Sequence, residues 1–266
     1  MASLRVYLEL AKRGYRRHSV YTTATVAGVF TNVVFGVLRV AVMVGVYANS
    51  SEIGGYRLAQ AVTYVWLVQG LMTVVRMYGG TELAMRIRSG DIAIDLLRPV
   101  DVQLSYLATD YGRAAYHALY RGIPPVLIGA LFYQIVTPGD PLMWLAFIAS
   151  VALAVAVSYL FRFLYNLSAF WLLDYRGVSL IAVIVVNLLS GFIVPVSFFP
   201  DWLATFASLT PFPSMVQTPV DLFTGHTSGL AALTALAVQV IWVGLLFLGC
   251  RIVFLRGRRM LVFQGG

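Results

Sequence analysis

The sequence predicts an all-α integral membrane protein, with six transmembrane helices in a single domain over residues 1–266. Hydrophobic residues make up 60% of the chain and charged residues only 11%, whereas soluble domains carry about a quarter charged residues. The mean hydropathy is +0.83. Six stretches of 18 to 29 residues contain no Asp, Glu, Lys or Arg, and about 20 apolar residues cross a bilayer. This composition excludes a water-soluble enzyme, a nucleic-acid-binding protein and a disordered chain.

The predicted spans follow these charge-free stretches in order along the chain. Their approximate bounds are 21–47, 58–77, 119–136, 142–164, 177–195 and 228–250. A further gap, 202–220, is too rich in proline for a transmembrane helix, because proline breaks helices. We expect a hairpin at the outer membrane surface there, with a short amphipathic helix over Trp202–Leu209.

The basic residues predict the orientation. Of 19 basic residues, 17 flank the spans on one side, Arg57 lies on the other side, and Arg39 lies inside the first span. Basic residues concentrate on the cytoplasmic side of cell membranes, so we expect both termini in the cytoplasm. The net charge of +8 therefore reflects membrane orientation and not a nucleic-acid partner.

Two cytoplasmic segments are amphipathic. The first, at the N-terminus, carries apolar residues at helical spacing from Leu4 to Tyr15 and is expected to lie among lipid headgroups or to contact a cytoplasmic partner. The second is the loop 79–101. Its apolar stripe, formed by Leu83, Ala84 and Ile87, precedes Gly90, which is suited to end a helix. This pattern predicts docking into another protein; the alternative is a solvated connecting loop.

Several single positions carry further expectations. Asp110 and Arg113 are spaced to pair on the cytoplasmic part of a long third helix, which Pro124 and Pro125 should kink. Asp174 and Arg176 suggest a turn with a local ion pair.

Arg39 lies 18 residues into the first span, where a charge is costly. Snorkelling to the surface, a structural pair and contact with an anionic substrate remain open for it.

No catalytic, cofactor-binding or metal site is expected. The chain has no G-x-x-x-x-G-K-[ST] motif, and its single lysine, Lys12, lies elsewhere. His18, His117 and His226 are too scattered for a metal pair, and Cys250 is the single cysteine.

Two motifs resemble the permeases of the type-2 ATP-binding-cassette (ABC) transporter family. The stretch IRSGDIAIDLLRP, residues 87–99, is similar to the "G-[DE]-hydrophobic…LL-[RK]-P" signature of a subfamily that pairs with a separate ATPase. The stretch 190–211 resembles the "SG…P…P-x-W…TP" run of the class.

The resemblance implies a membrane-spanning permease subunit of an ATP-driven exporter. Such a subunit works by alternating access with a second identical or paralogous permease and a cytoplasmic ABC ATPase dimer, which holds ATP and Mg. A lipophilic or amphiphilic cargo would follow a path that Arg39 could line. The resemblance assigns two sets of residues. The residues assigned to ATPase coupling are Glu82, Arg86, Arg88, Gly90, Asp91, Asp95, Arg98 and Pro99. The residues assigned to the outer gate are Gly191, Pro195, Pro200, Trp202 and Pro211.

Two alternatives remain: a membrane scaffold or sensor subunit without a substrate cavity, and a membrane-embedded enzyme that acts on lipid-linked substrates. A convergent acid–base pair in one cavity would favour the enzyme.

Overall fold

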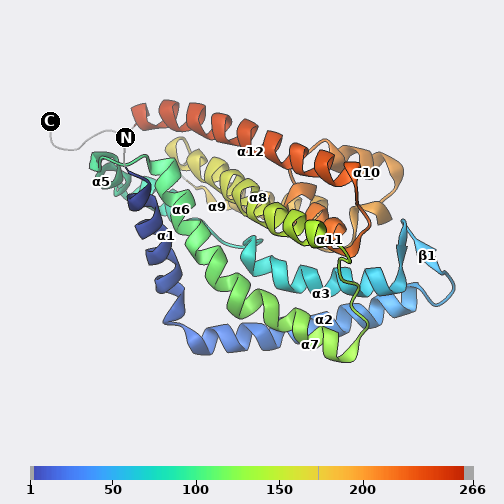
Figure 1. The fold of residues 1–266 in the computed structure, drawn as a ribbon. Helices are drawn as coiled ribbons and strands as arrows, with labels where there is room; N and C mark the ends of the chain where they lie inside the picture. Colours follow the sequence, from blue (N-terminus) through green and yellow to red (C-terminus); the bar gives the residue numbers. More distant parts are fainter. Residues whose placement is uncertain (1–2, 173, 261–266) are drawn as a thin grey trace.

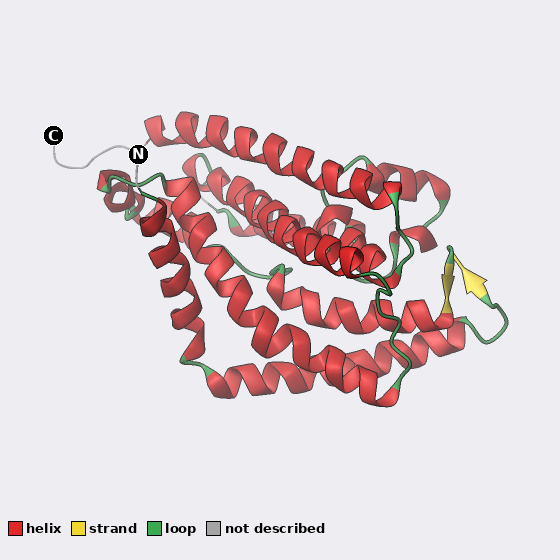
Figure 2. Ribbon diagram, viewed as in Figure 1, coloured by secondary structure: helices red, strands yellow, loops and turns green. Residues whose placement is uncertain are grey.

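The computed structural model describes residues 3–172 and 174–260, and over these residues it is helical apart from one small hairpin (Figures 1 and 2). The α-helices are α1 Leu4–Ser19, α2 Thr22–Val46, α3 Leu58–Val74, α4 Glu82–Ser89, α5 Ile92–Leu97, α6 Val102–His117, α7 Ile123–Phe132, α8 Pro141–Asn166, α9 Arg176–Leu189, α10 Asp201–Ser208, α11 Gln217–Thr224 and α12 Leu230–Gly257. Strands β1 Glu52–Ile53 and β2 Tyr56–Arg57 pair antiparallel.

A helix lies at each of the six predicted spans, but their lengths differ. Within the described residues, α2, α8 with its following turn, and α12 are long and apolar enough to cross a membrane. Helices α3 and α9 are apolar but shorter. Helix α9 stops at Leu189, before the predicted end at 195, because Gly191 takes a left-handed conformation with φ 84°.

Helix α3 occupies the centre of the molecule. Its residues from Ala61 to Leu71 are all buried, and it contacts α2, α6, α7 and α11. Trp66 fills the space beside Gly36 of α2 and Gly129 of α7, where any Cβ atom would overlap its ring. By contrast, α2, α9 and α12 expose many large apolar side chains on their outer faces. An apolar outer surface around a packed centre suits a protein whose solvent is lipid.

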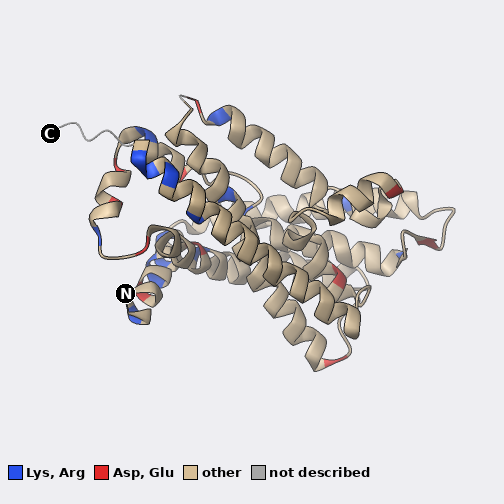
Figure 3. Cartoon of the chain, turned by 90° about the horizontal axis from the view of Figure 1, so that it is seen from above, with Lys and Arg blue, Asp and Glu red and all other residues tan. Residues whose placement is uncertain are grey.

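The charged residues gather at the two ends of the long helices. One end holds α1, α4, α5, the end of α12 and most of the lysine and arginine residues, and we call it the basic end (Figures 1 and 3). The other end holds β1–β2, α10 and α11, and we call it the hairpin end. Helix α1 runs across the direction of the long helices and packs along α6 (Figure 1).

The third span differs from the expectation. Helix α6 continues through a π-helical turn, Ala118–Gly122, into α7, so the irregularity precedes Pro124 and Pro125. Both prolines lie in the first turn of α7. Proline is favoured in the first turn of a helical segment, and here that turn follows directly on the π-helical turn.

The sequence did not predict the β1–β2 hairpin or helix α11, and the predicted ion pair between Asp174 and Arg176 is wrong. The pair Gly54-Gly55, at φ 57° and 79°, turns the β1–β2 hairpin, and α11 forms although Pro219 lies within it. Helix α10 coincides with the predicted amphipathic helix. The turn at Asp174 holds no ion pair to Arg176: the Asp174 carboxylate accepts the backbone N–H of Arg176 at 2.9 Å instead.

Candidate functional site

The loop between α3 and α6 folds into two short helices at the basic end. Helix α4 carries Glu82 in its first turn and Arg86 and Arg88 in its last, which complements the helix dipole. Gly90 ends α4 with φ 81°, as its position predicts. Helix α5 follows and ends before Pro99. The loop is therefore ordered and compact, and is not an extended connector.

The apolar stripe predicted to face a partner instead faces the chain itself. Leu83, Ala84, Ile87 and Ile92 are buried in the hydrophobic core, and Leu96 packs against it. Helix α4 packs against α8 and the turn that follows it, and α5 packs against α4. The expectation that another protein must cover this stripe is wrong, since the fold covers it.

A second apolar set, which the sequence reasoning missed, points outward. Met85, Ile94 and Leu97 are exposed, and so is Arg88. Both helices thus carry apolar residues on two faces, which is typical of a helix covered on both sides. The outward set Met85, Arg88, Ile94 and Leu97 is named here the α4–α5 face.

Three of the six predicted coupling charges, Arg86, Asp95 and Arg98, form ion pairs with one another. Arg86 Nε donates to Asp95 Oδ2 at 2.8 Å, and the Arg98 guanidinium lies 3.6 Å from the same carboxylate. Tyr106 of α6 donates its hydroxyl to Asp95 at 2.9 Å. Asp95 is buried, so this cluster fastens α5 to α4 and α6. Asp91 is exposed and accepts the Ser89 hydroxyl.

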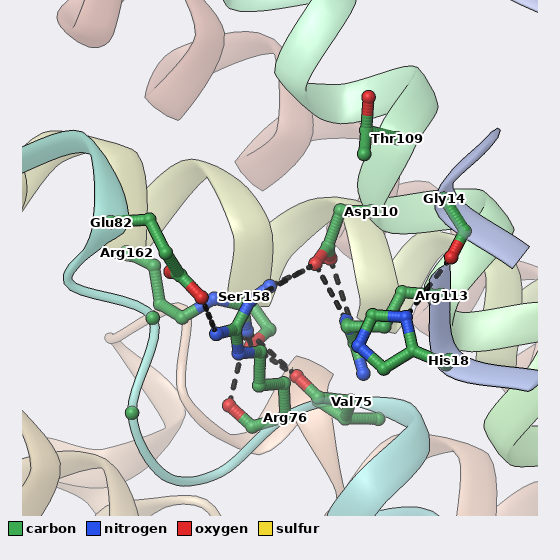
Figure 4. A network of polar contacts seen from close by, with 12 residues as sticks. Gly14, His18, Val75, Arg76, Glu82, Thr109, Asp110, Arg113, Ser158 and Arg162 are labelled. Atoms are coloured by element: carbon green, nitrogen blue, oxygen red, sulfur yellow. Dashed lines mark hydrogen bonds and ion pairs between the residues drawn. The ribbon is translucent and has the colours of Figure 1, made fainter. Parts of the chain in front are cut away.

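A buried ionic network lies directly behind these helices (Figure 4). Asp110 of α6 receives Arg113 Nε at 2.7 Å and Arg162 Nη2 of α8 at 2.7 Å. Arg76, just after α3, lies 3.8 Å from Asp110 and donates to Glu82 of α4 at 2.5 Å. The sequence predicted the Asp110–Arg113 pair but not the contacts with Arg162 and Arg76. One carboxylate therefore connects α3, α6 and α8, and the Arg76–Glu82 pair adds α4 to the network.

The same arginines cap the end of α3. Arg113 donates to the carbonyl oxygens of Thr73 and Val74 at 2.7 and 2.9 Å, and Arg162 donates to that of Val75 at 2.8 Å. These carbonyl oxygens have no N–H partner within α3. Cations at the C-terminus of a helix also interact favourably with the helix dipole. Arg76 then leaves the helix with φ 59°, which is uncommon for a residue other than glycine.

The electrostatics favour the ionised form of Asp110. Burial raises the pKa of its carboxyl group, but the adjacent guanidinium groups of Arg162 and Arg113 outweigh that effect. The result is a pKa lowered from 3.8 to about 2.

Asn166, at the end of α8, holds the start of α4. Its Oδ1 accepts the backbone N–H of Ala84 at 3.0 Å, and its Nδ2 donates to Gly80 O at 2.9 Å. This side chain supplies a partner for one of the N–H groups that the first turn of a helix leaves free. A displacement of α4 would therefore be transmitted to α8 through Asn166 as well as through the Asp110 network.

At the hairpin end, Arg39 makes a contact within the chain. Its Nη1 donates to Phe192 O at 3.0 Å, and its guanidinium lies 4.8 Å from the centre of the Phe192 ring. This geometry joins α2 to the segment after α9 and favours the structural role among the three that the sequence left open.

We expect Arg39→Ala to lower the thermal stability of the protein, by about 1–3 kcal/mol, because it removes a charge-assisted hydrogen bond and a cation–π contact. Arg39→Lys, which keeps the charge, should lose less. Thermal unfolding in detergent measures both variants. A protein with full stability but impaired transport would instead place Arg39 on the cargo path.

One predicted gate residue, Gly191, belongs to a hydrogen-bonded cluster at the hairpin end. Tyr64 donates its hydroxyl to Gly191 O at 2.6 Å and to Gln217 Oε1 at 2.8 Å. A Cβ atom at Gly191 would overlap the Tyr64 oxygen. Gln217 also donates to Asp221, which accepts the Tyr56 hydroxyl.

The other gate residues differ in exposure. Pro195 is buried and Pro211 is half-buried, whereas Pro200 and Trp202 are exposed at the start of α10. An exposed tryptophan at the end of an apolar helix bundle suits the level of the lipid headgroups.

Within residues 3–172 and 174–260, no group of three or more His, Cys, Asp or Glu side chains could hold a metal ion.

A comparison with protein families matches residues 33–265 to the ABC-2 family transporter proteins. The match covers most of the chain, from the middle of α2 onward. Comparisons with curated proteins and with solved structures gave no match.

Proposed function

The chain belongs to the ABC-2 family of transporter proteins, and we propose that it is the permease subunit of an ATP-driven exporter. Family membership makes it a membrane component of an ABC transporter, with an ABC ATPase as its partner. The observation that carries the finer proposal is the exposed α4–α5 face, with the buried network behind it. An apolar patch at the basic end offers a partner a surface, and the network connects that surface to α3, α6 and α8.

The proposed topology has six spans, with the basic end in the cytoplasm of the cell membrane. Within the described residues, three helices are long and apolar enough to cross, and α3, α7 with the π-helical turn before it, and α9 lie at the other predicted spans. The start of α1 and the end of α12 lie at the same end of the molecule, in keeping with an even number of crossings (Figure 1). The concentration of arginine at that end favours the cytoplasmic side.

A cysteine-accessibility scan tests this topology. In a background with Cys250 replaced, single cysteines at Ser208 and Thr227 should react with an impermeant thiol reagent added outside intact cells. Cysteines at Ser89 and Arg258 should react only after permeabilisation. Labelling of Ser89 from outside would contradict the proposed orientation.

In the proposed cycle, the ATPase dimer closes on ATP and Mg and moves the α4–α5 face. The Asp110 network and Asn166 pass this displacement to α3, α6 and α8, and the path opens toward the hairpin end. A second permease, identical or paralogous, completes the path. The apolar outer helices suit a lipophilic or amphiphilic cargo that enters from the membrane.

The function is tested by purification and reconstitution. The tagged chain, solubilised in mild detergent, should copurify with a protein that carries the phosphate-binding motif of ATPases. Vesicles that contain both proteins should move an amphiphilic reporter only with hydrolysable ATP. A chain that purifies without any ATPase, and whose vesicles show no ATP-dependent flux, would favour the scaffold role.

A further inference from the structure

A cavity of about 600 Å³ opens at the basic end, between α1, α4, α6 and α8. This volume lies in the range of small-molecule sites. One stripe of α1, formed by Val6, Leu10, Arg13 and Arg17, lines one wall. The proposed cycle assigns no role to this space.

The position of α1 against the cavity is fixed by close helix packing. Gly14 of α1 faces the Thr109 carbonyl of α6, and Gly112 of α6 faces the Ala11 carbonyl of α1. A Cβ atom at either glycine would overlap the facing carbonyl oxygen. The two backbones are thus in contact, and the stripe of α1 is held over the cavity.

The charge of the lining is unbalanced. Seven arginines line the cavity against three carboxylates, an excess of four positive charges. Arg113 and Arg162 already donate hydrogen bonds to Asp110 and to the carbonyl oxygens at the end of α3. Arg86 and Arg98 share Asp95.

Three arginines retain donors for a ligand. Arg76 binds Glu82 through Nη2 and only approaches Asp110, at 3.8 Å. Arg13 and Arg17, one helical turn apart, make no ion pair with any residue in the described part of the chain. Guanidinium groups match the oxygen geometry of phosphate. Several of them around one cavity create a positive electrostatic potential that a bound anion neutralises.

We propose that this cavity binds a phosphate-bearing anion, held by Arg13 and Arg17 of α1 and by Arg76 beside the Asp110 network. The phosphate comes from an anionic phospholipid of the surrounding leaflet or from a small soluble phosphate ester. A bound anion connects α1 to Arg76, which donates to Glu82 at the start of α4. Binding of the anion therefore stabilises the basic end. The proposal requires no transport activity.

The test compares two double variants of α1 with the same loss of charge. Arg13→Gln with Arg17→Gln removes the cavity pair, and Arg5→Gln with Arg16→Gln removes two arginines of the same helix that do not line the cavity. Native mass spectrometry counts phosphatidylglycerol bound to the full chain in detergent, with phosphatidylcholine as the neutral comparison. Calorimetry with glycerol 3-phosphate tests the soluble source.

The cavity variant should bind phosphatidylglycerol about tenfold to thirtyfold more weakly than the unaltered chain, since each basic residue near an anionic headgroup contributes about a fivefold factor. The control pair should bind almost normally, and Arg13→Lys with Arg17→Lys should recover part of the affinity. Binding of glycerol 3-phosphate alone, with the same dependence on Arg13 and Arg17, would support the site with a soluble ligand.

Equal weakening by both double variants would overturn the proposal, because it would indicate general attraction to the membrane surface. Loss of ATPase copurification in the cavity variant, with unchanged lipid binding, would also overturn it and assign the arginines to a protein contact. Thermal unfolding of each variant, measured without added lipid, separates misfolding from loss of the site.

Discussion

Ile94→Glu together with Leu97→Glu will release the ATPase from the permease while the helices remain folded. Leu97 is 85% exposed and Ile94 is 54% exposed at the basic end, so neither side chain supports the fold. Burial of each in a partner groove would contribute about 1.5–3 kcal/mol, and a carboxylate in its place would be buried without a partner. We expect affinity to fall at least about hundredfold. Copurification of the ATPase from membranes measures this loss.

The matched control is Leu4→Glu together with Leu8→Glu on α1. These leucines are 75% and 54% exposed, so the chemical change and the starting exposure are closely similar. They lie at the same end of the molecule but outside the α4–α5 face. If the control pair releases the ATPase and the α4–α5 pair does not, the docking surface belongs to α1.

The charges of the loop are less suited to such a test than their pattern suggests. Reversal of Arg86 would break its bond to buried Asp95 and disturb the contact between α4 and α5. Reversal of Arg88 alone leaves the fold intact, because its side chain is exposed. An exposed charge at the rim of an interface contributes little to affinity, so we expect a small change from Arg88→Glu.

The loop 79–101 shows what sequence patterns can and cannot predict. Gly90 and Pro99 locate the helix ends because their backbone preferences are local. The choice of the buried face is not local: α4 carries apolar residues on two sides, and packing against α8 and its following turn decides between them. The stripe with the better helical spacing proved to be the inner one, and Met85 and Leu97 lie on the outer one.

The buried network follows the same rule. Asp110 and Arg113 are three residues apart on one helix, so their pairing follows from helical geometry. Arg162 lies 52 residues from Asp110, and the contact exists because α6 and α8 pack side by side. Likewise, Arg39 could be recognised as a costly charge, but its partner Phe192 lies 153 residues away.

Asp110→Asn should be the most damaging single substitution at the basic end. It removes the carboxylate that, among the described residues, pairs with both Arg113 and Arg162, and both arginines are buried. Breaking a buried ion pair on one side costs about 3–5 kcal/mol, because the remaining charge is left without compensation. We expect a large fall in the thermal unfolding temperature in detergent, together with poor recovery of the folded protein.

Lowering the pH should protonate the Asp110 carboxyl group and so reduce the stability of the folded protein. The carboxyl group of Asp110 has its pKa lowered from 3.8 to about 2 in the folded protein, so the folded state favours the ionised form. Its contribution to stability is complete above pH 3.8 and disappears as the pH falls toward 2. Between pH 7 and pH 4, the difference in stability between the unaltered chain and Asp110→Asn should therefore stay nearly constant.

Asp101→Asn is the control, since it makes the same chemical change at the start of the same helix. Asp101 pairs with Arg251 at a partly exposed site and accepts the N–H of Leu104 as the N-cap of α6. Asparagine caps helices about as well as aspartate, so this variant should lose little. Adding Arg113→Gln to Asp110→Asn should recover part of the stability, because it removes one uncompensated charge. If Asp110→Asn proves as stable as Asp101→Asn, the network does not hold α3, α6 and α8 together, and Asn166 would remain as the connection from α4 to the long helices.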